Sequence, residues 1–77
     1  MDIEYNMLLD AAQDDCPVPT IKAKEALDKM QAGEILKVVA SKEGTVANMR
    51  TFVKNNPYEM VREVKSGGTF QFYIKKL

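Results

Sequence analysis

The stretch YEMVREVKSGGTFQFYIKK, residues 58–76, decides the fold of this chain. It contains two runs rich in β-branched and aromatic residues, which favour strands. Between the runs, Ser66-Gly67-Gly68 is a tight-turn signal, because glycine readily adopts the positive φ angles that two-residue hairpin turns need. The stretch therefore predicts an antiparallel hairpin.

The second strand of this hairpin has side chains of different character on its two sides. Successive side chains of a strand point to opposite faces, so every second residue shares a face. One face carries Phe70, Phe72 and Ile74, and the other carries Gln71, Tyr73 and Lys75. We expect the first face to be dry and the second face to be wet.

Upstream of the hairpin, strand and helix patterns alternate. The run at 34–41 is dense in β-branched residues, which indicates a strand buried on much of both faces. The predicted elements are a strand at 4–10, a helix at about 17–31, a strand at 34–41 and a helix at 45–56.

The ends of the two predicted helices have sequence signals of their own. We expect Gly33 to stop the first helix with a left-handed residue. Thr45 is the expected N-cap of the second helix, and Pro57 ends that helix because proline disfavours helix in the residue before it. The expected apolar stripe of the second helix is Val46, Met49, Phe52 and Val53.

The element order predicts an α+β fold, a two-layer α/β sandwich of order βαβαββ. Both helices are expected on one face of a four-stranded mixed sheet. With 77 residues, the chain is expected to form a single domain over residues 1–77 and to be a monomer.

Composition excludes several classes of function. Eleven Lys and Arg balance eleven Asp and Glu, so no overall field recruits nucleic acid or an anionic membrane. Neither a signal peptide nor a membrane span is expected. The chain has one cysteine and no histidine, which fits a reducing cytoplasm and leaves no Cys-His dyad, no imidazole metal ligand and no Cys-x-x-Cys pair. We therefore expect no cofactor and no metal, and Cys16 is the leading candidate for any chemistry.

Cys16 is followed by Pro17 and Pro19. Prolines suit the first turn of a helix, where the backbone N–H groups have no partner within the helix. This places Cys16 at the N-cap, where the helix dipole favours the thiolate, which is the reactive form. Asp14 and Asp15 act in the opposite direction, because neighbouring negative charge disfavours an anion. We expect the helix end to outweigh them, so that the pKa of Cys16 lies below that of a free cysteine.

The first helix also shows an unusual solvent side near the thiol. At 100° per residue, Ile21 falls on the side of Lys24, away from the core, and Val18 lies at the margin. The interpretation of Val18, Ile21 and Lys24 as a docking patch for a partner competes with the observation that isolated exposed apolar residues are common. The expected core arc is Pro19, Ala23, Ala26, Leu27 and Met30.

The chain resembles the sulfur-carrier family of TusA, SirA and YeeD-like proteins. The shared pattern is a leucine-aspartate, a short loop, and Cys-Pro-x-Pro at the start of the first helix. In this chain the pattern is Leu9, Asp10, Cys16, Pro17 and Pro19, and the similarity continues through ALDKMQAGEILKV (26–38) and FQFYIKK (70–76). The resemblance implies the same sandwich fold.

The resemblance also implies a function for Cys16. It implies a sulfurtransferase-type carrier, not a stand-alone enzyme, in which Cys16 holds sulfur as a persulfide. The implied partners are a sulfur-donor protein (a cysteine desulfurase or a rhodanese-like protein) and a downstream acceptor protein or thiosulfate transporter. The uses include tRNA thiolation, cofactor assembly and sulfur metabolism, and nothing in the sequence selects among them.

Two alternatives from other classes stay open. One is an RNA- or protein-binding module of initiation-factor-like fold, in which Cys16 is incidental and the helices carry a basic face of Lys22, Lys24, Lys29, Arg50 and Lys54. Zero net charge and the lack of aromatic stacking residues on those helices argue against RNA. The other is a single-cysteine redox sensor, which has to form its disulfide with another chain.

Overall fold

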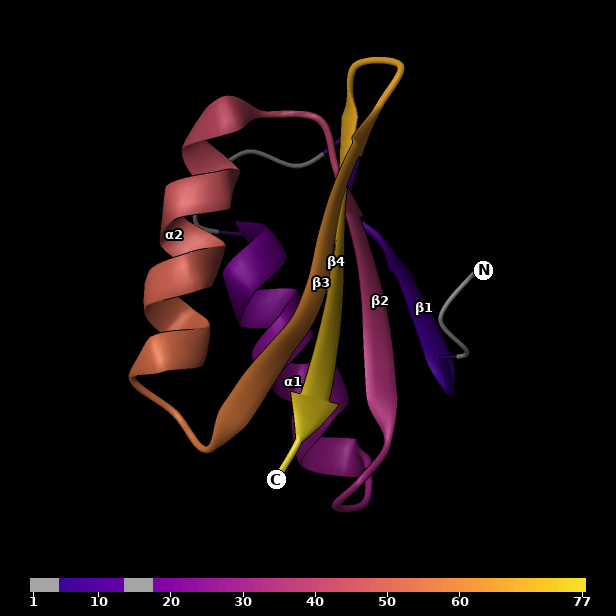
Figure 1. Ribbon diagram of the computed structural model, residues 1–77, viewed down its shortest axis with the longest axis vertical. Helices are drawn as coiled ribbons and strands as arrows, with labels where there is room; N and C mark the ends of the chain where they lie inside the picture. Colours follow the sequence, from indigo (N-terminus) through magenta and orange to yellow (C-terminus); the bar gives the residue numbers. More distant parts are fainter. Residues whose placement is uncertain (1–4, 14–17) are drawn as a thin grey trace.

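The hairpin and the elements before it assemble into a sheet with two helices beside it (Figure 1). This is a computed structural model, and the structure describes residues 5–13 and 18–77. The predicted element order is confirmed. In chain order the elements are β1 (Met7–Asp10), α1 (Val18–Lys29), β2 (Ile35–Ala40), α2 (Glu43–Lys54), β3 (Tyr58–Ser66) and β4 (Thr69–Lys76).

The sheet is mixed, with the strand order β1-β2-β4-β3. β1 pairs with β2 in parallel, whereas β4 is antiparallel to both of its neighbours, β2 and β3. Gly67 and Gly68 have φ angles of 55° and 84°, the two positive angles that a two-residue hairpin turn requires. The predicted hairpin is therefore confirmed together with its turn.

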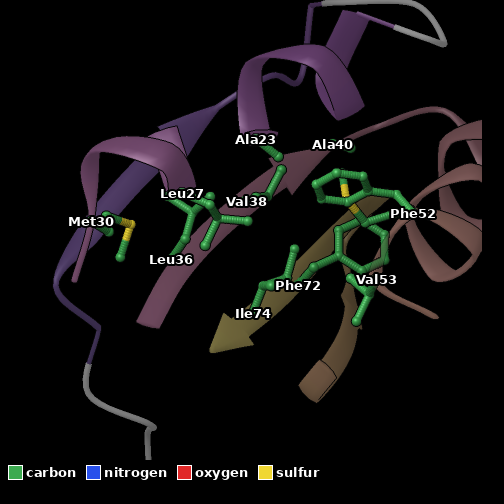
Figure 2. Packing of buried hydrophobic residues seen from close by; sticks show 11 residues of the cluster. Ala23, Leu27, Met30, Leu36, Val38, Ala40, Phe52, Val53, Phe72 and Ile74 are labelled. Atoms are coloured by element: carbon green, nitrogen blue, oxygen red, sulfur yellow. The ribbon is translucent and has the colours of Figure 1, made fainter. Parts of the chain in front are cut away.

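Both helices lie on the same face of the sheet, and the core fills the space between the two layers (Figures 1 and 2). The side chains that the sheet contributes to this core come from every second residue of β2 and β4, because only one face of each strand meets the helices. They are Leu36, Val38, Ala40, Phe72 and Ile74, and they pack against Ala23, Leu27, Met30, Met49, Phe52 and Val53 of the helical layer.

The C-terminal end of α1 differs from the prediction. The helix ends at Lys29, and Gly33, although its φ is 93°, lies in the turn that leads to β2. The carbonyls at the helix end are satisfied by a lysine from the last strand. The Nζ of Lys76 donates hydrogen bonds to the carbonyl oxygens of Leu27 (2.7 Å) and Met30 (2.8 Å). A cation at this end also complements the helix dipole.

Removal of this lysine is expected to weaken the fold. Lys76→Met keeps the aliphatic stem but leaves two half-buried carbonyls without their charged donor, so we expect the free energy of unfolding to fall by about 1–3 kcal/mol. Urea titration followed by circular dichroism measures the change. Lys75→Met is the matched control, because the structure gives the Lys75 ammonium no partner among the residues that it describes. An equal loss in both variants contradicts the role of Lys76.

The start of α2 is also different from the prediction. The helix begins at Glu43 and its N-cap is Lys42, which makes no side-chain capping bond. Thr45 is a fully buried residue of the first turn, and its hydroxyl has no partner among the described residues. The earlier start places the Glu43 carboxylate at the positive end of the helix dipole. Thr45 as N-cap is therefore wrong.

The face of the sheet that lies away from the helices is drier than predicted. Tyr73 is only 6% exposed. Its ring lies 6.4 Å from the ring of Tyr5, and the Nζ of Lys37 lies 5.1 Å from the Tyr5 ring centre and 5.6 Å from that of Tyr73. A cation over aromatic rings is attracted to their negative faces. The wet face predicted for β4 is wrong at Tyr73, because these two side chains cover it.

Candidate functional site

The candidate site is the connection between β1 and α1, which carries Cys16. Cys16 and Pro17 lie outside the described residues, so the predicted N-cap position of the thiol stays a prediction. The structure describes the chain on both sides of the connection, up to Gln13 and again from Val18. Those two flanks show what holds the chain before and after the connection.

The N-terminal flank is tied to the end of β2. The backbone N–H of Ala11 donates to the carbonyl of Val39 (2.8 Å), and Ala11 is fully buried. The hydroxyl of Ser41 donates to the carbonyl of Ala12. Parallel strands end at the same edge of a sheet, so β1 and β2 bring these residues together. The flank is thus anchored across two strands.

Asp10 has a local structural role in this flank. Its Oδ1 accepts a hydrogen bond from the N–H of Ala12 at 3.1 Å. A carboxylate that accepts from the N–H two residues on forms an Asx turn, which directs the chain out of a strand. The structure thus shows how Asp10, the aspartate of the Leu-Asp pair, starts the connection.

The C-terminal flank is the first turn of α1, and its core face agrees with the prediction. Pro19 is fully buried, and the structure confirms the burial of Ala23, Leu27 and Met30, with Ala26 half-buried. Ile21 is 53% exposed and points away from the core, as the helical spacing predicted, and Val18, which was predicted at the margin, is 39% exposed. The helix start is therefore held by its core face, while two apolar side chains stay exposed beside the connection.

Lys24, the third residue predicted for docking, is engaged on the same side of α1. Its Nζ lies 3.0 Å from Oδ2 of Asp28. The hydrogen bond and the negative charge of Asp28 raise the pKa of Lys24. The pair is exposed, so its contribution to stability is small.

Two of the five cations in the basic face that an RNA-binding module requires are paired with carboxylates. Besides the Lys24–Asp28 pair, the guanidinium of Arg50 lies against the carboxylate of Glu63 from β3, with an Nη2–Oε1 distance of 2.9 Å. The Glu63 carboxylate accepts hydrogen bonds from Arg50 and raises its pKa. These pairs weaken the RNA-binding alternative, because an unneutralised basic surface is what binds phosphate.

A hollow lies between α2 and the β3–β4 hairpin and was not predicted from the sequence. Its volume is about 260 Å³, and its lining includes Val46, Arg50, Lys65 and Phe70. The Nζ of Lys65 lies 5.6 Å from the ring centre of Phe70. No sequence signal marks this hollow, because it forms where residues from separate elements meet.

The chemistry available at the site is that of a thiol. Among the described residues, no three His, Cys, Asp or Glu side chains are grouped so as to hold a metal ion. In the same part of the chain, no helix is long and apolar enough to cross a membrane. The fold and the position of the single cysteine in the sequence define a class of protein: a small α+β sandwich with its lone cysteine on the connection that leaves the first parallel strand.

Comparison with known proteins identifies the family. The family model described as "Sulfurtransferase TusA" matches residues 7–76. The sulfur carrier protein TusA of Allochromatium vinosum is 36% identical over 73 residues, which cover 95% of this chain and 96% of the relative. The sulfur carrier protein TusA of Pseudomonas putida is 28% identical over 75 residues, covering 97% of this chain and 94% of the relative.

A solved structure agrees with the family match. The crystal structure of a SirA-like protein from Desulfitobacterium hafniense superposes with a TM-score of 0.80 at 25% identity, covering 91% of this chain and 96% of that one. This likeness confirms the predicted sandwich. The chain belongs to the TusA sulfurtransferase family, as its resemblance indicated.

Proposed function

We propose that this protein is a sulfur carrier that holds sulfane sulfur as a persulfide on Cys16 and passes it to a partner protein. The observation that carries the proposal is the family match over residues 7–76 in a chain whose sole thiol is Cys16. The anchored flanks support it, because a carrier must present its sulfur at a defined place. Cys16, Pro17, Pro19 and Asp10 are the proposed site residues, and the cytoplasm is the proposed location.

The proposed step exchanges one S–S bond for another. The Cys16 thiolate attacks the outer sulfur of a donor persulfide, the S–S bond of the donor breaks, and a new S–S bond forms on Cys16. The donor leaves as a thiolate, and the hydrogen on the outer sulfur moves with that sulfur. The step therefore needs no external oxidant or reductant, and the thiolate form of Cys16 is the nucleophile.

Delivery repeats the exchange in the opposite sense. A thiolate of the acceptor attacks the outer sulfur on Cys16, and Cys16 is released as a thiolate. No base is required on this chain if Cys16 is already ionised, which suits a protein without histidine. The donor class proposed is a cysteine desulfurase or a rhodanese-like protein, and the acceptor is a thiol-bearing protein or a thiosulfate transporter.

Mass spectrometry of the intact protein tests the proposal. After incubation with a cysteine desulfurase and cysteine, we expect the mass to increase by one sulfur atom, and dithiothreitol to remove the increase. Peptide mapping places the added sulfur on the peptide with Cys16. An increase that resists reduction, or one that maps to another peptide, contradicts the persulfide.

The exposed patch of Val18, Ile21 and Lys24 is the proposed docking surface beside the thiol. Ile21→Asp places a charge where a partner surface must exclude water, so we expect transfer from the desulfurase to slow by about tenfold. Because Ile21 is 53% exposed, the thermal midpoint is expected to change little. Leu77→Asp, at another exposed apolar residue, is the control. Unfolding of the Ile21 variant contradicts the assignment of this residue to the surface.

A further inference from the structure

The two edges of the sheet are built differently. The strand order leaves β1 and β3 as the edge strands, each paired on one side only among the described residues. Unpaired backbone groups at an edge are a template for another strand, and proteins protect such edges with charges and bulges. The two edges here differ in how much of that protection they have.

The β3 edge is protected. A register shift between Met60 and Arg62 marks a bulge, which bends and twists the strand away from a regular partner. Charged side chains also occupy much of the strand, and most of them are exposed. They are Glu59, Arg62, Glu63 and Lys65.

The β1 edge has less of this protection, because it has no bulge and its single charged residue, Asp10, lies at its end. Its four residues pair with β2 in continuous register, and its sequence is Met-Leu-Leu-Asp. Met7 is 39% exposed and Leu8 is 54% exposed, and as neighbours in a strand they lie on opposite faces of the sheet. An added strand at this edge meets apolar surface above and below its own backbone.

This edge leads directly to the candidate site. Asp10 ends β1, the anchored residues Ala11 and Ala12 follow, and Cys16 is four positions further along the chain. A segment bound along β1 therefore runs toward the connection that carries the thiol. Recognition through the backbone also tolerates different side-chain sequences.

We propose that the free edge of β1 receives an extended, apolar segment of the sulfur-donor protein, which adds a strand to the sheet and brings the donor's persulfide to Cys16. The inference rests on the proposed carrier function and adds the mode of recognition. The chemistry of the edge defines the occupant: unpaired backbone donors and acceptors for hydrogen bonds, and apolar side chains that contact Met7 and Leu8.

The test compares loading of Cys16 from two kinds of source. A cysteine desulfurase and a rhodanese-like protein, each charged with sulfur, must dock on the carrier, whereas inorganic polysulfide needs no docking surface. The variants are Leu8→Lys and Met7→Lys, since lysine at an edge opposes strand addition. Val61→Lys is the matched control, because Val61 lies on the opposite edge strand and has the same 39% exposure as Met7.

We expect both β1 variants to load about tenfold more slowly from the protein donor, and to load from polysulfide at the rate of the unmodified protein. Val61→Lys is expected to be unaffected with both sources. Amide hydrogen exchange within residues 7–10 is expected to slow when the donor is bound, because the N–H groups that face away from β2 become hydrogen-bonded. Equal thermal midpoints show that the variants are folded.

Other results overturn the inference. Strand addition at β1 is excluded if the Leu8→Lys and Met7→Lys variants load at the normal rate from the protein donors. It is also excluded if the loading rate of Val61→Lys falls by as much as theirs. The inference is also excluded if polysulfide loads the unmodified protein but neither protein donor does. If polysulfide itself leaves no removable sulfur on Cys16, the carrier function fails, and the two failures are thus distinguishable.

Discussion

Cys16→Ser is expected to abolish sulfur acceptance completely while the protein stays folded. A hydroxyl cannot form a persulfide, and the chain has no second cysteine to replace the thiol. Serine is close to cysteine in size, and it is a favourable N-cap residue, so a helix start at this position tolerates it. The core that the structure describes comes from the helices, β2 and β4, so the variant is expected to keep its fold.

The experiment measures both the radioactive sulfur bound to the protein and its thermal stability. Wild type and variant are incubated with a cysteine desulfurase and radiolabelled cysteine sulfur, and the thermal midpoint is recorded for each. Cys16→Ala serves as a second variant without the thiol and without a capping hydroxyl. Label that persists on either variant shows that the sulfur binds at a residue other than Cys16. Collapse of the midpoint in both variants assigns Cys16 to the core and overturns the carrier interpretation.

Leu27→Ala is expected to cause the largest loss of stability. Leu27 belongs to α1 and is fully buried, with Leu36 and Val38 of β2 near it (Figure 2). Truncation of a buried leucine removes apolar contacts and leaves a cavity, which costs about 2–5 kcal/mol. The whole free energy of unfolding of a chain this short is about 4–12 kcal/mol. The variant is therefore expected to be at the limit of stability.

Urea unfolding measures this loss. With a slope of about 1 kcal/mol per molar urea, a loss of about 3 kcal/mol lowers the midpoint by about 3 M. Ile21→Ala is the matched control on the same helix, because Ile21 is exposed and its truncation removes few contacts. A similar midpoint shift in both variants shows that the core is not where Figure 2 places it.

Local sequence signals predicted most of the fold. The Gly67-Gly68 turn and the alternation in β4 determined the hairpin, because both act between neighbouring residues. The helical spacing of α1 separated Ala23 and Leu27 from Ile21 correctly for the same reason. Family resemblance added the sandwich as a whole, and the structural comparison confirms it.

Features that join distant residues could not be predicted. The bonds from Lys76 to the end of α1 connect residues more than forty positions apart, and no pattern along the chain specifies them. Burial of Tyr73 depends on Tyr5 and Lys37, which reach it across the sheet. The hydroxyl of Thr45 suits an N-cap, but Thr45 is buried against the core in the first turn of α2. Tertiary packing decided each case.

At the candidate site the sequence indicated the thiol but not its supports. The Cys-Pro-x-Pro motif was visible directly, as was the apolar pair Val18 and Ile21. The bond from Ser41 to Ala12 depends on β1 and β2 ending at the same edge, which is a property of the assembled sheet. The asymmetry between the two edge strands likewise required the strand order.

The position of β4 has a consequence for how the protein folds during synthesis. β4 is made after the other three strands, yet it lies between β2 and β3. A growing chain that has completed β3 therefore has no hydrogen-bonded partner for β3 and only β1 beside β2. Pairings between distant segments slow folding, and unpaired edges expose nascent chains to aggregation. We expect the sheet to assemble only once residues 69–76 are available, so that β4 acts as the late, central strand on which cooperative folding depends.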